Sequence, residues 1–217
     1  MKPFVIVTDS CSDLPKELRD RFNIDYLYMH FIYDGNDVLA SLDWEFVPVK
    51  DFYNLMRNGT RITTAQVTTP DYLEAFEKYV KNGFDVLSIS CSSALSGSYK
   101  ASTIAREEVL KKYPDAKIIC IDSLNSCMGL GSMCINASIM REEGKPIEEV
   151  AAYIEENKLY YHQIATVDDL AYLKRAGRVS ATSAFFGSIL KIKPIVISDA
   201  IGQNFASEKV KGRKASI

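Results

Sequence analysis

The sequence predicts an α/β protein whose N-terminal domain is built on a mainly parallel sheet. The short, continuous apolar run Phe4–Thr8 is typical of a strand that is buried on both faces, and a further strand is predicted over Val86–Ser90. Segments of helical period separate these runs, and the short joints imply right-handed crossovers of a Rossmann-like kind. After Tyr160 this alternation stops. We therefore expect an N-terminal α/β domain over residues 1–160 and an incomplete second α/β domain over residues 161–217.

Local signals place the first elements after the opening strand. Ser12 or Asp13 can cap a helix that runs to Arg21. Ile24–Phe31 is then predicted as one further strand, which ends before the turn signal Asp34-Gly35-Asn36.

The Thr69-Pro70 pair predicts a helix start, with the Thr69 hydroxyl as the cap and Pro70 at the first helical position. One face of this helix carries Tyr72, Phe76, Tyr79 and Val80. In a helix over Gly97–Tyr113, the residues expected to face inward are Ala101, Ile104, Ala105 and Val109. Further helices are expected over Val49–Arg57, Met128–Glu143 and Ile147–Tyr160, and a further strand over Ile118–Ile121.

Beyond residue 160 the predicted elements are shorter. A strand is expected over Gln163–Val167, and Pro194–Ser198 and Asn204–Lys209 flank a turn at Asp199–Gly202, which is typical of a hairpin. Short helices are expected over Leu170–Arg175 and Ser183–Leu190.

Composition and charge exclude several classes of function. The chain has 26 Lys+Arg against 28 Asp+Glu, a formal net charge of −2, whereas a nucleic-acid-binding protein needs a basic surface. The two histidines, His30 and His162, are far apart, so no His-rich metal centre is expected. The five cysteines lack a C-x-x-C pair and are expected to be reduced thiols. Because no signal peptide or run of transmembrane length is evident, we expect a cytoplasmic protein without an integral membrane segment.

Hydroxyl groups and carboxylates follow the predicted parallel strands, at the edge where open α/β sheets bind ligands. The strand ends read Thr8-Asp9-Ser10, Ser90-Cys91-Ser92-Ser93 and Asp122-Ser123. Hydroxyls donate and accept hydrogen bonds but are poor acids or bases near neutral pH. Asp9 and Asp122 can act as acid and base or as magnesium ligands, although aspartates at strand ends more often cap or orient a loop.

The loop from Ser92 to Ser98 is rich in serine and leads into a predicted helix. Free N–H groups and the helix dipole favour an anion at such a position. A carboxylate or phosphate held by Ser92, Ser93 and Ser96 is therefore the natural ligand. The alternative is that these serines only cap the helix.

Two further polar segments are candidates for the same ligand. Thr60–Pro70 has five threonines, of which only Thr69 is expected to be a cap, and the alternative interpretation is a solvated loop. Gly177 can end a helix and leave Arg178 free to bind a carboxylate or phosphate in a bidentate way. Arg178 can equally be a surface charge or a partner contact.

Several known signatures are absent from the sequence. It contains no G-x-x-x-x-G-K-[ST] phosphate loop and no G-x-S-x-G nucleophile turn. Gly129-Leu130-Gly131 lacks the third glycine of a dinucleotide-binding fingerprint, because Cys134 stands at that position. We therefore expect no cofactor, no resident metal and no catalytic triad.

Taken together, these clusters resemble the motifs of the DegV family, whose members bind fatty acids in bacteria. Thr64-Ala65-Gln66-Val67 is similar to the family's T-S-Q-P segment, and Ser92–Tyr99 is similar to its S-S-x-L-S-G-T-Y motif. The other similar segments are Val7–Pro15, Asp122-Ser123, Gly129–Gly131, Tyr172–Ser180 and Leu190–Ile195. The resemblance spans essentially the whole chain.

The resemblance implies a carrier that is not itself an enzyme and that encloses one long-chain fatty acid, such as palmitate or oleate, between two α/β domains. Its carboxylate is expected at the Thr64 and Ser93 hydroxyls, for presentation to a fatty-acid kinase that makes an acyl phosphate. Arg178 lies in a region that the family uses near the site or the kinase. Ser92, Ser96, Asp9 and Ser10 are expected nearby, and candidates for tunnel lining or core packing are Phe185, Phe186, Ile189 and Leu190.

The sequence departs from the family pattern in three places. Ala65 replaces a serine, Val67 replaces a proline, and the chain stops at Lys211–Ile217, where the family has further elements that include a histidine near the carboxylate. We therefore expect a fragment or a truncated member with a partly open tunnel. Two other functions stay open: an enzyme acting on a small phosphorylated or carboxylated metabolite, and an interaction module that regulates a kinase.

Overall fold

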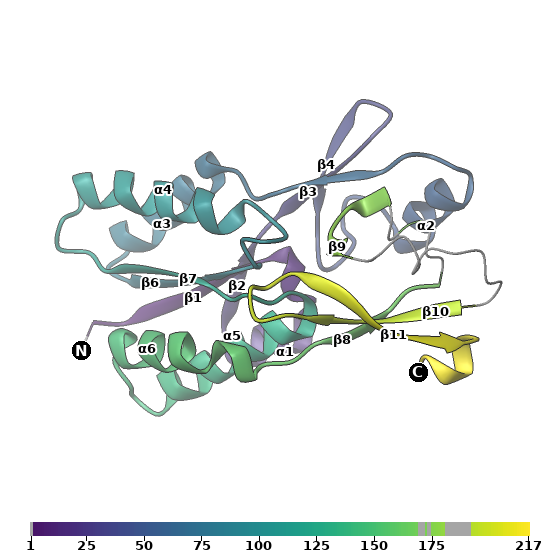
Figure 1. Cartoon of the computed structure of the whole chain (residues 1–217). Helices are drawn as coiled ribbons and strands as arrows, with labels where there is room; N and C mark the ends of the chain where they lie inside the picture. The colour runs from purple at the N-terminus through teal and green to yellow at the C-terminus, as the bar shows by residue number, and fades with distance from the viewer. Residues whose placement is uncertain (1, 169–171, 173–174, 181–191) are drawn as a thin grey trace.

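The computed structural model describes residues 2–168, 172, 175–180 and 192–217. At its centre is a four-stranded parallel sheet in the order β2-β1-β6-β7 (Figure 1). The strands are β1 (Phe4–Asp9), β2 (Ile24–Leu27), β6 (Asp85–Ser90) and β7 (Ile118–Asp122). The predicted α/β class with a parallel N-terminal sheet is confirmed.

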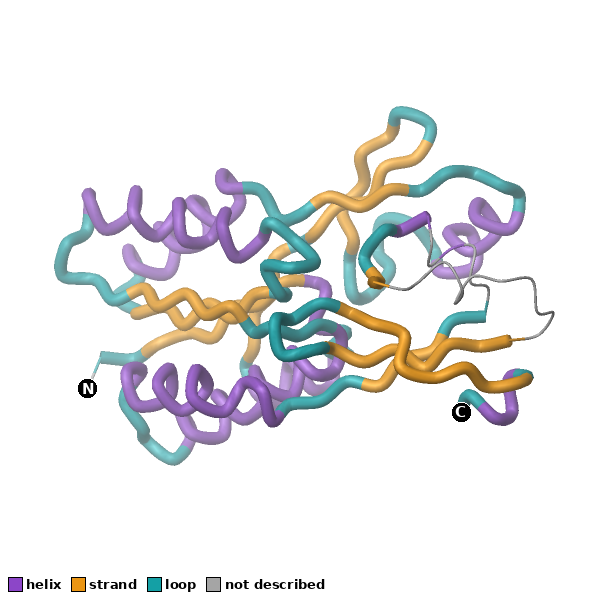
Figure 2. Tube along the Cα trace, in the orientation of Figure 1, coloured by secondary structure: helices purple, strands orange, loops and turns teal. Residues whose placement is uncertain are grey.

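Helices cover both faces of this sheet (Figures 1 and 2). One face carries α3 (Thr69–Lys81) and α4 (Ser98–Lys112), and the other carries α1 (Lys16–Phe22), α5 (Cys127–Glu142) and α6 (Ile147–Asn157). Both faces of the central strands are apolar, so both must be covered. Along β1, Ile6 joins the core shared with α5 and α6, whereas Val7 joins the core shared with α3 and α4. Within the described ranges, no helix is long and apolar enough to cross a membrane.

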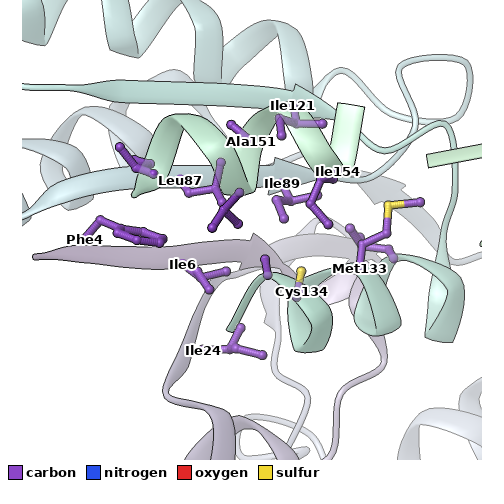
Figure 3. Packing of buried hydrophobic residues seen from close by; sticks show 14 of the residues in the cluster. Phe4, Ile6, Ile24, Leu87, Ile89, Ile121, Met133, Cys134, Ala151 and Ile154 are labelled. Carbon is purple, nitrogen blue, oxygen red and sulfur yellow. The ribbon is translucent and has the colours of Figure 1, made fainter. Parts of the chain in front are cut away.

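The larger of the two cores fixes α5 against the central strands (Figure 3). Ile6, Leu87 and Ile89 come from β1 and β6, and they meet Met133 and Cys134 of α5; all five side chains are fully buried. Cys134 therefore packs as a small apolar side chain. Because α5 begins beside the carboxyl ends of the strands, this core also positions the start of α5 at the site.

A second, antiparallel sheet has the order β4-β3-β5. It consists of β3 (Met29–Tyr33), β4 (Asn36–Ala40) and β5 (Thr63–Ala65), with α2 (Val49–Arg57) between β4 and β5. The prediction of one strand over Ile24–Phe31 is wrong, because the chain leaves the parallel sheet at Tyr28 and enters this one. At the break, the Met29 N–H donates to Ser10 Oγ at 3.0 Å. Both β2 and β3 contain apolar residues, so the hydrophobic pattern does not show that the chain passes from one sheet to another between them.

The segment after residue 160 forms a mixed sheet in the order β8-β10-β11-β9. Its strands are β8 (Ile164–Thr166), β9 (Val179–Ser180), β10 (Ile192–Ser198) and β11 (Asn204–Lys211), followed by a 3-10 turn η4 (Arg213–Ala215). The predicted hairpin is confirmed by antiparallel pairing of β10 with β11. The predicted helix over Leu170–Arg175 lies partly outside the described residues, and that over Ser183–Leu190 lies wholly outside them. The division of domains at residue 160 stays a prediction.

Helix ends differ from the predictions in three places. α1 begins at Lys16 after Pro15 without a side-chain cap, because Ser12 belongs to a 3-10 turn η1 (Ser10–Ser12) and Asp13 has a left-handed φ of 53°. The predicted helix over Ile147–Tyr160 ends at Asn157, and a 3-10 turn η2 (Lys158–Tyr160) follows it. In α3, Thr68 rather than Thr69 is the cap: its hydroxyl accepts the Asp71 N–H, and the Asp71 carboxylate accepts the Thr68 N–H. This reciprocal arrangement satisfies two N–H groups where a single cap satisfies one.

The inward faces of α3 and α4 are narrower than predicted. In α4, Ala101, Ala105 and Val109 are buried, but Ile104 is 42% exposed. In α3, the buried residues are Tyr72, Ala75 and Phe76, whereas Tyr79 and Val80 are only partly buried.

Gln163 joins the mixed sheet to the start of α5. Its buried amide donates to Ser198 Oγ at 2.8 Å and to Asn204 Oδ1 at 2.6 Å. Its Oε1 accepts the hydroxyl of Ser126, the residue that precedes α5, at 2.8 Å. One side chain therefore connects the β10–β11 hairpin to the site end of the parallel sheet.

We expect Ile6→Ala to lower the free energy of unfolding by about 2–5 kcal/mol, because it removes contacts of a fully buried side chain and leaves a cavity. Ile104→Ala makes the same chemical change on an exposed helix position, so its effect should stay below about 1 kcal/mol. Urea unfolding followed by circular dichroism measures both. Equal losses in the two variants would contradict the two placements.

Candidate functional site

A buried carboxylate joins the carboxyl ends of the two central strands. Asp9, the last residue of β1, is fully buried, and it accepts the N–H of Cys11 at 3.0 Å and the N–H of Cys91, after β6, at 2.8 Å. Burial raises the pKa of Asp9 to about 6, and the two N–H groups oppose that rise. Asp9 therefore orients the two loops that leave these strands.

A second carboxylate fixes the loop that carries Ser93. Asp122 is the last residue of β7, and its Oδ1 accepts the N–H of Ser93 at 3.0 Å and the N–H of Leu124 at 3.1 Å. Asp9 and Asp122, the two carboxylates weighed for an enzyme, thus both accept backbone N–H groups. Among the described residues, no group of three His, Cys, Asp or Glu side chains could hold a metal ion.

Ser92 stabilises the loop that carries Ser93 through buried hydrogen bonds. It is fully buried, its Oγ accepts the Ala94 N–H at 3.2 Å, and its own N–H donates to the Asn125 carbonyl at 2.9 Å. The tip of the β10–β11 hairpin lies against it, since a Cβ at Gly202 would stand 2.2 Å from Ser92 Oγ. Glycine is needed at this position for the close approach and for its φ of +78°.

The loop before α4 packs against the threonine-rich segment. A Cβ at Gly97 would stand 1.7 Å from Gln66 Oε1, so only glycine lets Gln66 lie there. Ser98 Oγ accepts the Val67 N–H at 3.2 Å and is 3.0 Å from Ser96 Oγ. Ser96 Oγ in turn accepts the Ser98 N–H at 3.2 Å, a local turn bond, whereas the N-cap of α4 is Gly97 and has no side-chain cap.

These loops enclose a pocket of about 840 Å³, called here the hydroxyl pocket. Its hydroxyl-bearing side chains are Ser10, Thr64, Ser93, Ser96 and Ser126, and its basic side chains are His30 and Arg178. No Asp or Glu from the described part of the chain lines it. The structure thus brings Thr64, Ser93, Ser96, Ser10 and Arg178 to one cavity, whereas Ser92 and Asp9 lie behind its wall.

Thr64 and His30 reach the pocket from neighbouring strands. Thr64 on β5 pairs with Phe31 on β3, and the next pair is His30 with Ala65. His30 Nδ1 lies 2.7 Å from Asp37 Oδ1, and its Nε2 lies 3.9 Å from Asp71 Oδ2. His30 could not be placed at the site from the sequence, because neither histidine is near a serine cluster in sequence and the pairing of β3 with β5 is long-range.

A smaller apolar pocket of about 390 Å³ adjoins the hydroxyl pocket, and Ser10, Ala40 and Thr64 line both. We call it the aromatic pocket, because Phe31, Trp44, Phe46 and Phe52 form much of its wall. Phe52 packs edge-on against Phe31, with ring centres 5.1 Å apart, and against Trp44 at 5.4 Å. These aromatic residues were not predicted from the sequence. The tunnel candidates predicted from it lie outside the described residues: Phe185, Phe186, Ile189 and Leu190.

The family model described as "Uncharacterised protein, DegV family" matches residues 3–217. This chain belongs to the DegV family. A DegV domain-containing protein of Clostridium perfringens is 44% identical over 217 residues, which are 100% of this chain and 74% of that protein. Another, from Caldanaerobacter subterraneus, is 33% identical over 217 residues, 100% of this chain and 75% of that protein. The resemblance read from the motifs is confirmed.

Solved DegV structures share the fold over the whole chain. A DegV family protein from Thermus thermophilus, described by its fatty-acid binding, has a TM-score of 0.85 at 28% identity and covers 100% of this chain and 74% of its own. A stearic acid-binding protein from Eubacterium ventriosum has a TM-score of 0.87 at 26% identity, covering 98% of this chain and 72% of its own. DegV of Bacillus subtilis, a fatty acid binding protein, has a TM-score of 0.81 at 27% identity, covering 100% and 74%.

The buried carboxylate of Asp9 gives a pH prediction. Its pKa of about 6 in the folded chain exceeds the ordinary 3.8, so its contribution to stability is fully present below about pH 3.8 and is lost as the pH rises through 6. The free energy of unfolding of wild type minus that of Asp9→Asn should therefore fall by about 2–3 kcal/mol between about pH 4 and pH 7. Urea unfolding of both proteins across this range measures the difference. A difference that stays constant with pH would refute the assignment.

Proposed function

We propose that this chain binds one long-chain fatty acid, such as palmitate or oleate, with the carboxylate at the Thr64 and Ser93 hydroxyls. The observation that carries the proposal is the hydroxyl pocket, which offers hydroxyl donors and two basic side chains to an anion and no opposing carboxylate from the described residues. The fatty acids bound by similar DegV structures support the choice of ligand. Binding rather than catalysis is proposed because Asp9 and Asp122 are committed to backbone N–H groups.

Electrostatics also favour placement of the ligand's carboxylate beside the serine loop. The loop Ser93–Gly97 lines the pocket and leads directly into α4, a helix of 15 residues that begins at Ser98. The N-terminal end of a helix carries a partial positive charge and free N–H groups, which stabilise a carboxylate. Arg178 adds a full positive charge, and its Nη1 donates to the Ala176 carbonyl at 2.9 Å, which orients the guanidinium.

The acyl chain requires an apolar surface. Burial of hydrocarbon contributes roughly 0.8 kcal/mol per CH₂ group. We place part of the chain in the aromatic pocket, because Thr64 lines both cavities and its methyl and hydroxyl groups can serve both ends of such a ligand.

We further propose that the bound fatty acid is presented to a fatty-acid kinase in the cytoplasm, where ATP is available for phosphorylation of the carboxylate. The loaded chain, mixed with such a kinase and Mg-ATP, should yield acyl phosphate, and the unloaded chain should not. Kinase binding by a lipid-free chain, without acyl phosphate from a loaded one, would favour the interaction module instead.

Native mass spectrometry of the purified chain tests the proposed ligand directly. The expected spectrum contains the mass of the chain plus one long-chain fatty acid, and organic extraction should release that acid. A chain that carries no lipid and also fails to bind added palmitate or oleate would contradict the proposal.

Thr64→Val and Ser93→Ala are each expected to weaken fatty-acid binding by about 10- to 100-fold, because each removes a hydrogen bond to a charged group. Isothermal titration with palmitate measures the effect. Thr103→Val and Ser132→Ala are matched controls, since their hydroxyls bond to helix carbonyls of Lys100 and Met128 and line neither pocket. Unchanged affinity in both site variants would refute the carboxylate position.

A further inference from the structure

Three of the cysteines line the hydroxyl pocket, a placement that fatty-acid binding does not require. Cys11 lies on η1 after β1, Cys91 follows β6, and Cys127 begins α5. The other two are elsewhere: Cys134 is buried in the core with α5, and Cys120 packs against the core with α3 and α4. Three thiols therefore lie in the pocket near the position proposed for the carboxylate.

Cys11 and Cys91 are held close together by the backbone. One carboxylate, that of Asp9, accepts the N–H groups of both residues. The strands that precede them, β1 and β6, are also paired in parallel up to Val7 with Ser88, so Cys11 and Cys91 follow the sheet at the same edge. Adjacent strands are about 4.8 Å apart, which is within the Cα separations of about 4.4–6.8 Å that a disulfide spans.

The side chains of this pair also interact, since the neighbouring Cys11 thiol, together with burial, raises the pKa of the Cys91 thiol. Cys127 is placed differently: burial and the nearby Asp13 carboxylate raise the pKa of its thiol, and its backbone has a left-handed φ of 50°. Of the three thiols in the pocket, Cys11 and Cys91 therefore form the pair best placed to join.

We propose that Cys11 and Cys91 are an oxidative modification site, converted by a hydroperoxide to a disulfide that lowers the affinity of the hydroxyl pocket for its ligand. The expected loss of affinity rests on the proposed fatty-acid binding, whereas the formation of the disulfide does not.

The reaction is balanced with hydrogen peroxide as the oxidant. The Cys11 sulfur attacks one peroxide oxygen, the O–O bond breaks, and a sulfenic acid and one water form. The Cys91 sulfur then attacks the Cys11 sulfur, the S–O bond breaks, and a second water leaves with the thiol proton. Two thiols and one peroxide thus give one disulfide and two waters. Cys11 reacts first because it is partly exposed, whereas Cys91 is buried and its pKa is raised by the neighbouring Cys11 thiol and by burial.

The disulfide acts on the ligand through the wall of the hydroxyl pocket. Bonding draws the two sulfur atoms to about 2.05 Å. Both cysteines line the pocket, together with Ser10 and Ser93. The disulfide therefore changes the shape of the pocket wall beside the proposed carboxylate position.

The test oxidises the purified, reduced full chain with hydrogen peroxide and maps disulfides by mass spectrometry of unreduced peptides. A Cys11–Cys91 peptide pair is expected, and palmitate should bind at least threefold more weakly until dithiothreitol restores the affinity. Cys11→Ser and Cys91→Ser should abolish both effects, and Cys120→Ser, a thiol outside the pocket, should abolish neither. In a glutathione redox buffer, saturating palmitate should shift the thiol–disulfide equilibrium toward the reduced pair, since the linkage is reciprocal.

Several results would overturn the inference. Absence of the Cys11–Cys91 pair, or a disulfide that joins Cys127 instead, refutes the modification site. A Cys11–Cys91 disulfide with unchanged palmitate affinity refutes its effect on the pocket. Failure of the reduced chain to bind palmitate would count against the proposed function, while peptide mapping would still decide whether the thiol pair forms. If Cys91→Ser fails to fold, Cys11→Ser alone decides between these outcomes.

Discussion

The buried carboxylate of Asp9 is the constraint on which the site depends. Two loops leave the central strands at the same edge of the sheet, and an N–H group near the start of each donates to the buried Asp9. Asp9 satisfies both N–H groups, at the cost of holding a charge in a buried position. Asp122 repeats this arrangement one strand further along, where it anchors Ser93. With their carboxylates committed in this way, the strand ends present neutral hydroxyls to the cavity.

Close contacts between distant segments complete the pocket around this edge. Gly97 admits Gln66, which brings β5 and Thr64 beside the serine loop, and Gly202 admits Ser92, which seats the hairpin of the mixed sheet. Gln163 links that hairpin to the start of α5. The cavity is thus bounded by residues on or next to the three sheets.

Much of this arrangement can be predicted from the sequence, and the remainder has physical reasons. Buried apolar runs identify the parallel strands, and the topology of such sheets then places Asp9, Ser93 and Asp122 at one edge. The hydrophobic pattern reports burial but not the partner strand, so the break at Tyr28 and the arrival of His30 at the pocket are not visible in it. The aromatic pocket was missed for a related reason, since its aromatic side chains come from β3, from the loop after β4 and from α2. Thr64 was placed at the site through the family motif rather than through periodicity.

We propose that two hydroxyls, that of Thr64 on the antiparallel sheet and that of Ser93 at the end of the parallel sheet, hold a fatty-acid carboxylate between them. A crystal structure of the chain with bound palmitate tests this proposal. The carboxylate oxygens should lie within hydrogen-bond distance, about 2.5–3.2 Å, of Thr64 Oγ1 and Ser93 Oγ. A head group bound away from both hydroxyls, in the aromatic pocket or on the outer surface, would contradict the account.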